Sequence, residues 1–213
     1  MSITLHYASG SPYAWRAWLA LEHKQLPYRL ATLSFSAGDL KKPAFLALNP
    51  RHKVPVLQDD DFAIYESAAI LDYLEEAYPA RPLLPRDVRA RATARRMIRE
   101  TDEYLARALE VLVDEILFTP AEKRDAARIE HGRDAFTDEL AAFEDMLRGD
   151  WFAGDVGAVD YSIYPIVALA LRMQLRVPSL GIDRALGPKL TAWQARFEAL
   201  PVFATTYPPH WKQ

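Results

Sequence analysis

The chain has 213 residues, half of them hydrophobic, which is enough for one large or two small domains with proper cores. Its 26 Lys and Arg against 29 Asp and Glu give a net charge of -3, so overall charge attracts it to neither nucleic acid nor an anionic membrane. No apolar run reaches the ~18 residues of a membrane span and the N-terminus lacks signal-peptide features, so we expect a cytoplasmic protein without membrane or nucleic-acid partners. Cysteine is absent, which excludes disulfides, zinc-thiolate sites and a protein thiol as nucleophile.

Residues 1–78 alternate between strand and helix patterns. The strand patterns lie at 3–7, 28–33, 54–58 and 62–65, and the helical patterns at 13–24, 43–48 and 67–78. A connection of helix length separates the first two strands, whereas the tight turn 59–61 joins the last two. This βαβαββα order predicts an α/β domain with a mixed sheet covered by helices.

The rest of the chain shows only helical patterns. Three prolines between residues 79 and 85 cannot continue a helix, so we expect a linker at 79–87. Beyond it we expect helices at 88–117, from Thr119-Pro120 to about Leu147, at 159–175 and at 182–200, followed by an irregular tail from Pro201. The sequence therefore predicts an α/β domain at 1–78 and an all-helical domain at 88–213.

Ser11 and Pro12 form the expected start of the first helix. Ser is a preferred N-cap residue and Pro a preferred first helical residue. The free N–H groups and the dipole of a helix start suit an anion, and a Ser hydroxyl there can donate a hydrogen bond to a thiolate. The same two residues also make an ordinary helix start, so this local signal leaves both interpretations open.

Two further pairs of residues have both a structural and a functional interpretation. Pro55 begins a strand and is a candidate for a cis peptide bond after Val54, which would either mark an edge strand or turn the Val54 backbone toward a peptide-like ligand. Glu66 and Ser67 begin a helix, where they either cap it or receive an amino-acid head group. In the second case Glu66 takes the ammonium, and Ser67 with helix N–H groups takes the carboxylate.

In their order along the chain, these motifs resemble the glutathione transferase family, in particular its cytosolic, serine-type, bacterial-like members. Residues 11–16, 49–57 and 64–75 resemble that family's catalytic turn, cis-proline loop and γ-glutamyl clamp. Residues 160–165 resemble the capped central helix of its all-helical domain. The resemblance thus spans nearly the whole chain.

The resemblance implies a thioredoxin-like domain that binds glutathione as co-substrate, a helical domain that forms the second-substrate pocket, and a homodimer. It implies that Ser11 is the catalytic hydroxyl, that His52 and Lys53 reach the glycyl carboxylate, and that the Val54 backbone pairs with the cysteinyl unit. The full set of implied glutathione-binding residues is Ser11, His52, Lys53, Val54, Pro55, Glu66 and Ser67. Tyr13 and Tyr104 are expected to line the second-substrate pocket.

Some positions depart from the family pattern or leave alternatives. Ser9 and Tyr7 are rivals of Ser11 as thiol activator. His52 stands where lysine is frequent, and Gly157 stands where Ser or Thr is the frequent helix cap. Asp102 is a further candidate for reaching the glutathione of a partner subunit.

We therefore expect a glutathione transferase, an enzyme that activates the glutathione thiol for attack on a hydrophobic electrophile, as in detoxification. One alternative is a glutathione-dependent isomerase of the zeta type, because Ser11, Trp15 and Arg16 resemble the serine-rich turn of those members. Another is a non-catalytic ligand-binding or regulatory member of the fold. We expect no metal, because the scattered histidines have no metal-ligand spacing: His6, His23, His131 and His210.

Overall fold

The computed structural model describes residues 2–212, which divide into two compact units. The first contains the chain up to Arg86 together with the residues from Ala199 onward, and the second is Asp87–Glu198. The sequence predicted that everything from residue 88 to 213 would form the helical domain. The structure instead groups the C-terminal segment with the α/β unit, for reasons of side-chain packing given below.

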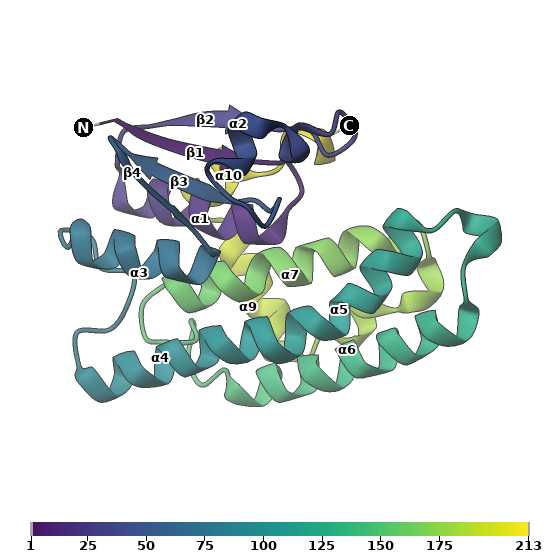
Figure 1. The fold of residues 1–213 in the computed structure, drawn as a ribbon. Coiled ribbons are helices and arrows are strands. Elements are labelled where there is room, and N and C mark those ends of the chain that lie inside the picture. The colour runs from purple at the N-terminus through teal and green to yellow at the C-terminus, as the bar shows by residue number, and fades with distance from the viewer. Residues whose placement is uncertain (1, 213) are drawn as a thin grey trace. The chain divides into compact units, whose positions relative to one another are not determined.

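The first unit is built on a four-stranded mixed sheet in the order β2-β1-β3-β4 (Figure 1). Strand β1 (Ile3–Tyr7) runs parallel to β2 (Tyr28–Thr32) and antiparallel to β3 (Val56–Asp59), which pairs antiparallel with β4 (Phe62–Tyr65). The parallel pair is joined by a helix and the β3–β4 pair by a tight turn. The predicted thioredoxin-like arrangement is confirmed.

Helices α1 (Pro12–Lys24) and α3 (Ser67–Ala77) pack against the sheet and against each other (Figure 1). Their apolar side chains supply the core, and Leu19 and Leu74 have no exposed surface at all. The short helix α2 (Pro43–Leu46) follows a 3-10 turn at Asp39–Lys41. All three predicted helices of this unit are present, each within two residues of the predicted ends.

The C-terminal segment is helical, so the predicted irregular tail is wrong. Helix α10 (Pro201–Thr206) and the 3-10 turn Pro209–Trp211 each begin with a proline, which suits a first helical position. Trp15 of α1 donates its indole N–H to Thr206 Oγ1 at 2.9 Å and meets the Trp211 ring edge to face at 5.5 Å. Burial of these aromatic rings holds the segment on α1.

The second unit begins with a continuous helical run, as predicted. Its parts are α4 (Val88–Glu100), a π-helical turn at Thr101–Leu105, α5 (Ala106–Val113) and a second π-helical turn at Asp114–Phe118. The antiparallel helix α6 (Ala126–Met146) packs closely on α5 at Gly132, where a Cβ would meet Val111 at 3.1 Å. A larger residue at 132 would therefore require the side chains of Val111 and Leu112 to shift.

The start of α6 lies later than predicted. Residues 121–123 form only a 3-10 turn, and α6 begins after Asp125, whose carboxylate accepts from the N–H groups of Ala127 and Arg128. Arg124 donates to the carbonyl groups of Glu115 and Ile116, which ties the connecting segment back to the preceding helical end. Because of these contacts, the α-helix begins at Ala126 and not at the predicted Thr119-Pro120 start.

Helix α7 (Ala158–Gln174) is followed by a 3-10 turn at Pro178–Leu180, α8 (Ile182–Ala185) and α9 (Pro188–Glu198). The predicted single helix at 182–200 is therefore broken. The Glu144 carboxylate accepts from the N–H groups of Lys189 and Leu190, and it occupies the place where a Cβ on Gly187 would lie. A side chain from α6 thus fixes where α9 begins.

Asp160 organises the start of α7. Its buried carboxylate accepts from Trp193 Nε1 at 2.8 Å, Gly157 N at 3.1 Å and Phe152 N at 3.3 Å. Burial raises the pKa of Asp160 to about 6, against the opposite effect of these donors. Gly157, which departs from the family pattern, still donates its backbone N–H to this carboxylate.

No helix among residues 2–212 is both long and apolar enough to cross a membrane.

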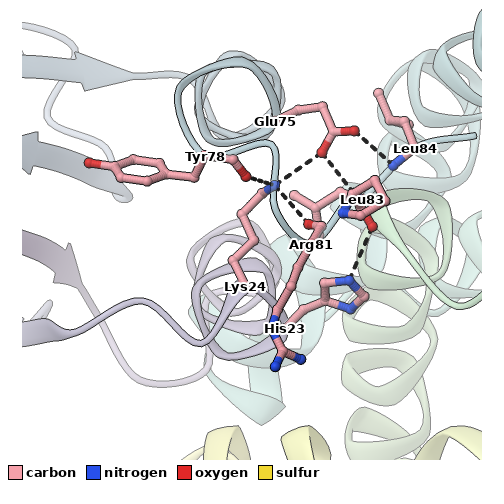
Figure 2. Close-up of polar contacts among 8 residues, drawn as sticks. His23, Lys24, Glu75, Tyr78, Arg81, Leu83 and Leu84 are labelled. Atoms are coloured by element: carbon pink, nitrogen blue, oxygen red, sulfur yellow. Dashed lines mark hydrogen bonds and ion pairs between the residues drawn. The ribbon is translucent and has the colours of Figure 1, made fainter. Parts of the chain in front are cut away.

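A buried polar cluster fastens the proline-rich segment after α3 to α1 (Figure 2). Lys24, whose side chain is 1% exposed, donates to Glu75 Oε2 at 3.1 Å and to the carbonyl groups of Tyr78 and Arg81 at 2.8 and 2.9 Å. Glu75 in turn accepts from the N–H of Leu83 at 2.7 Å. The buried Lys24 ammonium and the part-buried Glu75 carboxylate therefore each have further hydrogen bonds, as a charge removed from water requires.

His23 lies beside this cluster, with Nε2 3.1 Å from the Pro82 carbonyl oxygen. Burial lowers the pKa of His23 and so favours the neutral ring in the folded chain, although the hydrogen bond to the Pro82 carbonyl acts in the opposite direction. Because the pKa of His23 is lower in the folded chain than in the unfolded chain, protons bind the unfolded chain more readily. The free energy of unfolding therefore decreases as the pH falls from the unfolded pKa toward the folded pKa of His23.

We expect Lys24→Met to lower the free energy of unfolding by about 1–3 kcal/mol, because it leaves the carbonyl groups of Tyr78 and Arg81 and the part-buried Glu75 carboxylate without their donor. Lys42→Met is the matched control: Lys42 forms an exposed ion pair with Asp39 at 2.7 Å, which contributes little in water. Urea unfolding of both variants measures the difference. Equal midpoints for the two variants would contradict the importance of the cluster.

Candidate active site

The turn between β1 and α1 presents Ser11 at a helix N-terminus. Ser11 N donates to Ala8 O at 3.1 Å, which closes the turn, and Ser11 Oγ accepts from Ala14 N at 3.3 Å. Pro12 is the first helical residue. The predicted N-cap is confirmed, and the half-exposed hydroxyl lies at the positive end of the α1 dipole.

The two rival hydroxyl groups are held differently. Ser9 Oγ lies 2.6 Å from His210 Nδ1 of the C-terminal turn. Tyr7 is 5% exposed, and its ring packs against the Trp18 ring with centroids 5.2 Å apart. Of the three, only the Ser11 hydroxyl combines partial exposure with the N-cap position of α1.

The loop before β3 has the predicted cis peptide bond between Val54 and Pro55. Val54 is buried, and its backbone lies outside the hydrogen-bonding register that joins β3 to β1 and β4. His52 and Lys53 lie next to it with exposed side chains.

Asn49 shapes this loop and was not singled out by the sequence analysis. Its side chain is buried, donates to Lys53 O at 2.7 Å and accepts from Arg51 N at 2.9 Å. The only sequence signal was the Asn-Pro pair, which is typical of a turn. Asn49 therefore fixes the segment that carries His52 and Lys53.

The start of α3 has an unusual backbone. Glu66, at the N-cap position, has φ 70° and ψ 109°, in a region that residues other than glycine rarely adopt. Its side chain is exposed and makes no capping hydrogen bond to the helix. Strain of this kind typically costs ~1–3 kcal/mol and is found where a side chain or amide must face a ligand.

Ser67 is buried beneath Glu66 and bonded to Arg16 of α1. The Arg16 Nε and Nη2 atoms donate to Ser67 Oγ at 3.1 and 2.5 Å. Because the oxygen accepts from Arg16, the hydroxyl hydrogen can be donated to an anion. Arg16 is itself only 3% exposed and lies 5.4 Å from the Tyr13 ring centre, so it adds a fixed positive charge next to Ser67. No pattern in the sequence indicated that Arg16 and Ser67 would pair.

The sheet brings the three motifs to one edge. His6 pairs with Val56, and Val56 pairs with Tyr65. The end of β1, the beginning of β3 and the end of β4 therefore lie side by side. Ser11 lies four residues after the end of β1, Val54–Pro55 immediately precedes β3, and Glu66–Ser67 immediately follows β4. Residues from three separate parts of the sequence therefore lie at the same end of the sheet.

Tyr13 lies half-buried in the first turn of α1, and Tyr104 is 57% exposed in the π-helical turn after α4. They belong to different units, and their joint role in a second-substrate pocket stays a prediction, as does the role of Asp102. Within residues 2–212, no group of three or more His, Asp or Glu side chains could hold a metal ion.

Residues 10–77 match the family model described as "Glutathione S-transferase, N-terminal domain". Glutathione S-transferase A of Pleuronectes platessa is 27% identical over 216 residues, covering 98% of this chain and 92% of that protein. A probable maleylacetoacetate isomerase of Vibrio cholerae is 29% identical, covering 98% of this chain and 96% of its own. Pyrimidodiazepine synthase of Drosophila melanogaster is 30% identical, covering 92% of this chain and 76% of its own.

Solved structures agree over the whole chain. A glutathione S-transferase of the Antarctic clam Laternula elliptica has a TM-score of 0.85 and 29% identity, covering 100% of this chain and 95% of that one. A theta class glutathione S-transferase of Xanthomonas axonopodis pv. citri, with glutathione bound, has a TM-score of 0.83 and 27% identity, with 96% of each chain covered. Together with the geometry above, these similarities show that the chain belongs to the glutathione transferase family of enzymes.

Proposed function

We propose that this chain is a serine-type glutathione transferase, in which the Ser11 hydroxyl stabilises the thiolate of bound glutathione for attack on a hydrophobic electrophile. The observation that carries the proposal is the meeting of Ser11, Val54 and Ser67 at one edge of the sheet. The glutathione bound by the theta class relative supports the same ligand here.

The γ-glutamyl head group is zwitterionic, and the start of α3 offers both charges. The exposed Glu66 carboxylate suits the ammonium group. The Ser67 hydroxyl, the helix N–H groups and the nearby Arg16 guanidinium suit the carboxylate. We assign these three residues to the two ends of this head group.

The rest of glutathione is a short peptide, for which the loop before β3 is suited. We assign the Val54 backbone to the cysteinyl unit, next to Pro55, because it lies just before β3 and outside the sheet register. His52 and Lys53 are assigned to the glycyl carboxylate, since both are exposed cations or potential cations on a loop fixed by Asn49.

Activation of the thiol requires little energy. A free thiol with a pKa of about 8.5 is only a few per cent thiolate at neutral pH. Each unit by which its pKa is lowered needs about 1.4 kcal/mol, and one hydrogen bond to a charged group supplies that much. The proton leaves to solvent, and the sulfur then forms a bond to the electrophilic carbon. In a substitution the leaving group, such as chloride, departs with the electron pair of its bond to that carbon, and in an addition the π electron pair moves to the neighbouring atom, which takes up a proton from solvent. Tyr13 and Tyr104 are our candidates for contacts with the electrophile.

A second candidate function is glutathione-dependent isomerisation of the zeta type. The relative from Vibrio cholerae that favours it is named a probable maleylacetoacetate isomerase and matches over almost the full length of this chain. Trp15 and Arg16 also follow the zeta pattern. Both functions need the same thiolate at Ser11, and turnover of maleylacetoacetate in the presence of glutathione distinguishes them.

We further propose that the protein is a homodimer in the cytoplasm. Analytical ultracentrifugation measures the mass in solution and so tests the dimer.

Replacing Ser11 by Ala should lower turnover about 10- to 1000-fold with an electrophile such as a chlorodinitrobenzene, because one positioned donor to the thiolate is lost. Glutathione affinity should change less than about threefold, since the head-group contacts remain. Calorimetric titration and steady-state kinetics measure the two quantities.

Ser11→Gly controls for the loss of the helix cap, because glycine is a tolerated cap that lacks the hydroxyl. Ser36→Ala is the matched control for loss of an exposed serine hydroxyl. The assignment fails if Ser11→Gly turns over like the wild type.

Glu66→Gln should weaken glutathione binding about 10-fold, because the ammonium group loses its ion pair. The same substitution should leave the affinity for a glutathione analogue without the α-amino group nearly unchanged. Glu76→Gln, on an exposed position of the same helix, is the control. Equal losses for glutathione and the analogue would show that Glu66 does not bind the ammonium.

A further inference from the structure

The C-terminal 3-10 turn lies directly on the candidate catalytic turn. Gly10, between Ser9 and Ser11, has φ +88°, and a Cβ there would lie 2.7 Å from His210 Cε1 and 3.3 Å from Trp211 Nε1. Only glycine fits this backbone conformation and this close approach. The backbone of the β1–α1 turn is therefore in contact with residues at the far end of the chain.

A polar bond joins the same two turns. Ser9 Oγ and His210 Nδ1 are 2.6 Å apart, although 201 positions separate them in the sequence. A hydroxyl–imidazole pair at this distance is a normal hydrogen bond, in which either group can donate. Ser9 is two residues before Ser11, and the bond from Ser11 N to Ala8 O encloses Ser9 and Gly10 within one tight turn.

The partner of this turn is itself anchored. Trp211 is 8% exposed and packs edge to face on Trp15, and Thr206 accepts a hydrogen bond from the same Trp15. Tyr207 adds an edge-to-face contact with Trp15 at 6.0 Å. His210 is thus carried on a rigid support rather than on a free chain end, although its own ring is exposed.

We propose that His210 is a positioning residue for thiol activation, which acts through Ser9 to hold the turn that carries Ser11. This inference rests on the proposed function. His210 forms a hydrogen bond with Ser9 and packs on Gly10. These contacts fix the backbone that orients the Ser11 hydroxyl and the first N–H groups of α1 toward the thiolate. A loosened turn would bind glutathione through the same head-group contacts but stabilise its thiolate less well.

The test measures the pKa of the thiol of bound glutathione, from thiolate ultraviolet absorbance as a function of pH. For His210→Ala and Ser9→Ala, we expect the thiolate fraction at neutral pH to fall about 3- to 10-fold, up to one unit in thiol pKa. Glutathione affinity should stay within about twofold. His210→Asn should restore most of the signal, because its side-chain amide reaches the position of Nδ1.

The double variant Ser9→Ala with His210→Ala should behave like either single variant, since both remove the same bond. His131→Ala, at an exposed position of α6 in the other unit, is the matched control and should match the wild type. If His210→Ala disturbs Trp211 packing, seen in near-ultraviolet circular dichroism, His210→Phe takes its place, because it keeps an aromatic ring beside Gly10 but removes Nδ1. Ser9→Ala alone does not decide, since it would also lower the signal if Ser9 itself activated the thiol.

A normal wild-type thiolate signal that Ser9→Ala and His210→Ala leave unchanged overturns this inference and leaves the proposed function intact. Additive effects in the double variant overturn it as well. Absence of any thiolate signal in the wild type overturns the proposed function itself, and this inference with it.

Discussion

The turn between β1 and α1 is the constraint on which the rest of the first unit depends. The hydrogen bond from Ser11 N to Ala8 O reverses the chain, and Pro12 starts α1 at once. The strand, the helix and the C-terminal segment therefore all meet at four residues. The same geometry that satisfies the N-terminal N–H groups of α1 also makes a site for an anion. Structure and candidate chemistry here have a single physical origin.

The order and direction of the strands bring the other candidate site residues to the same end of the sheet as this turn. Because β3 runs antiparallel to both β1 and β4, the residues before β3 lie beside those after β1 and β4. Arg16 then links α1 to α3 by donating to Ser67, and its guanidinium group is almost completely buried. The strained backbone of Glu66 lies at the same edge. Buried charge and backbone strain both oppose stability, so their coincidence here points to ligand binding.

Local signals in the sequence were enough for the strands, the Ser11 cap and the cis bond before Pro55, because each depends on neighbouring residues. Predictions were wrong where a distant side chain decides. Glu144 begins α9 from another helix, and burial against Trp15 turns the tail into a helix. The contact of His210 with the β1–α1 turn joins residues 201 positions apart, and no periodicity or motif in the sequence indicates it.

The central claim is that this chain binds glutathione and holds its sulfur as a thiolate, and one titration tests it most directly. Glutathione is added to the wild-type protein near neutral pH, while calorimetry follows binding and ultraviolet absorbance follows the thiolate. We expect saturable binding at one site per chain, with thiolate absorbance that rises in proportion to occupancy. Saturable binding without a thiolate signal, or no binding at all, would contradict this claim.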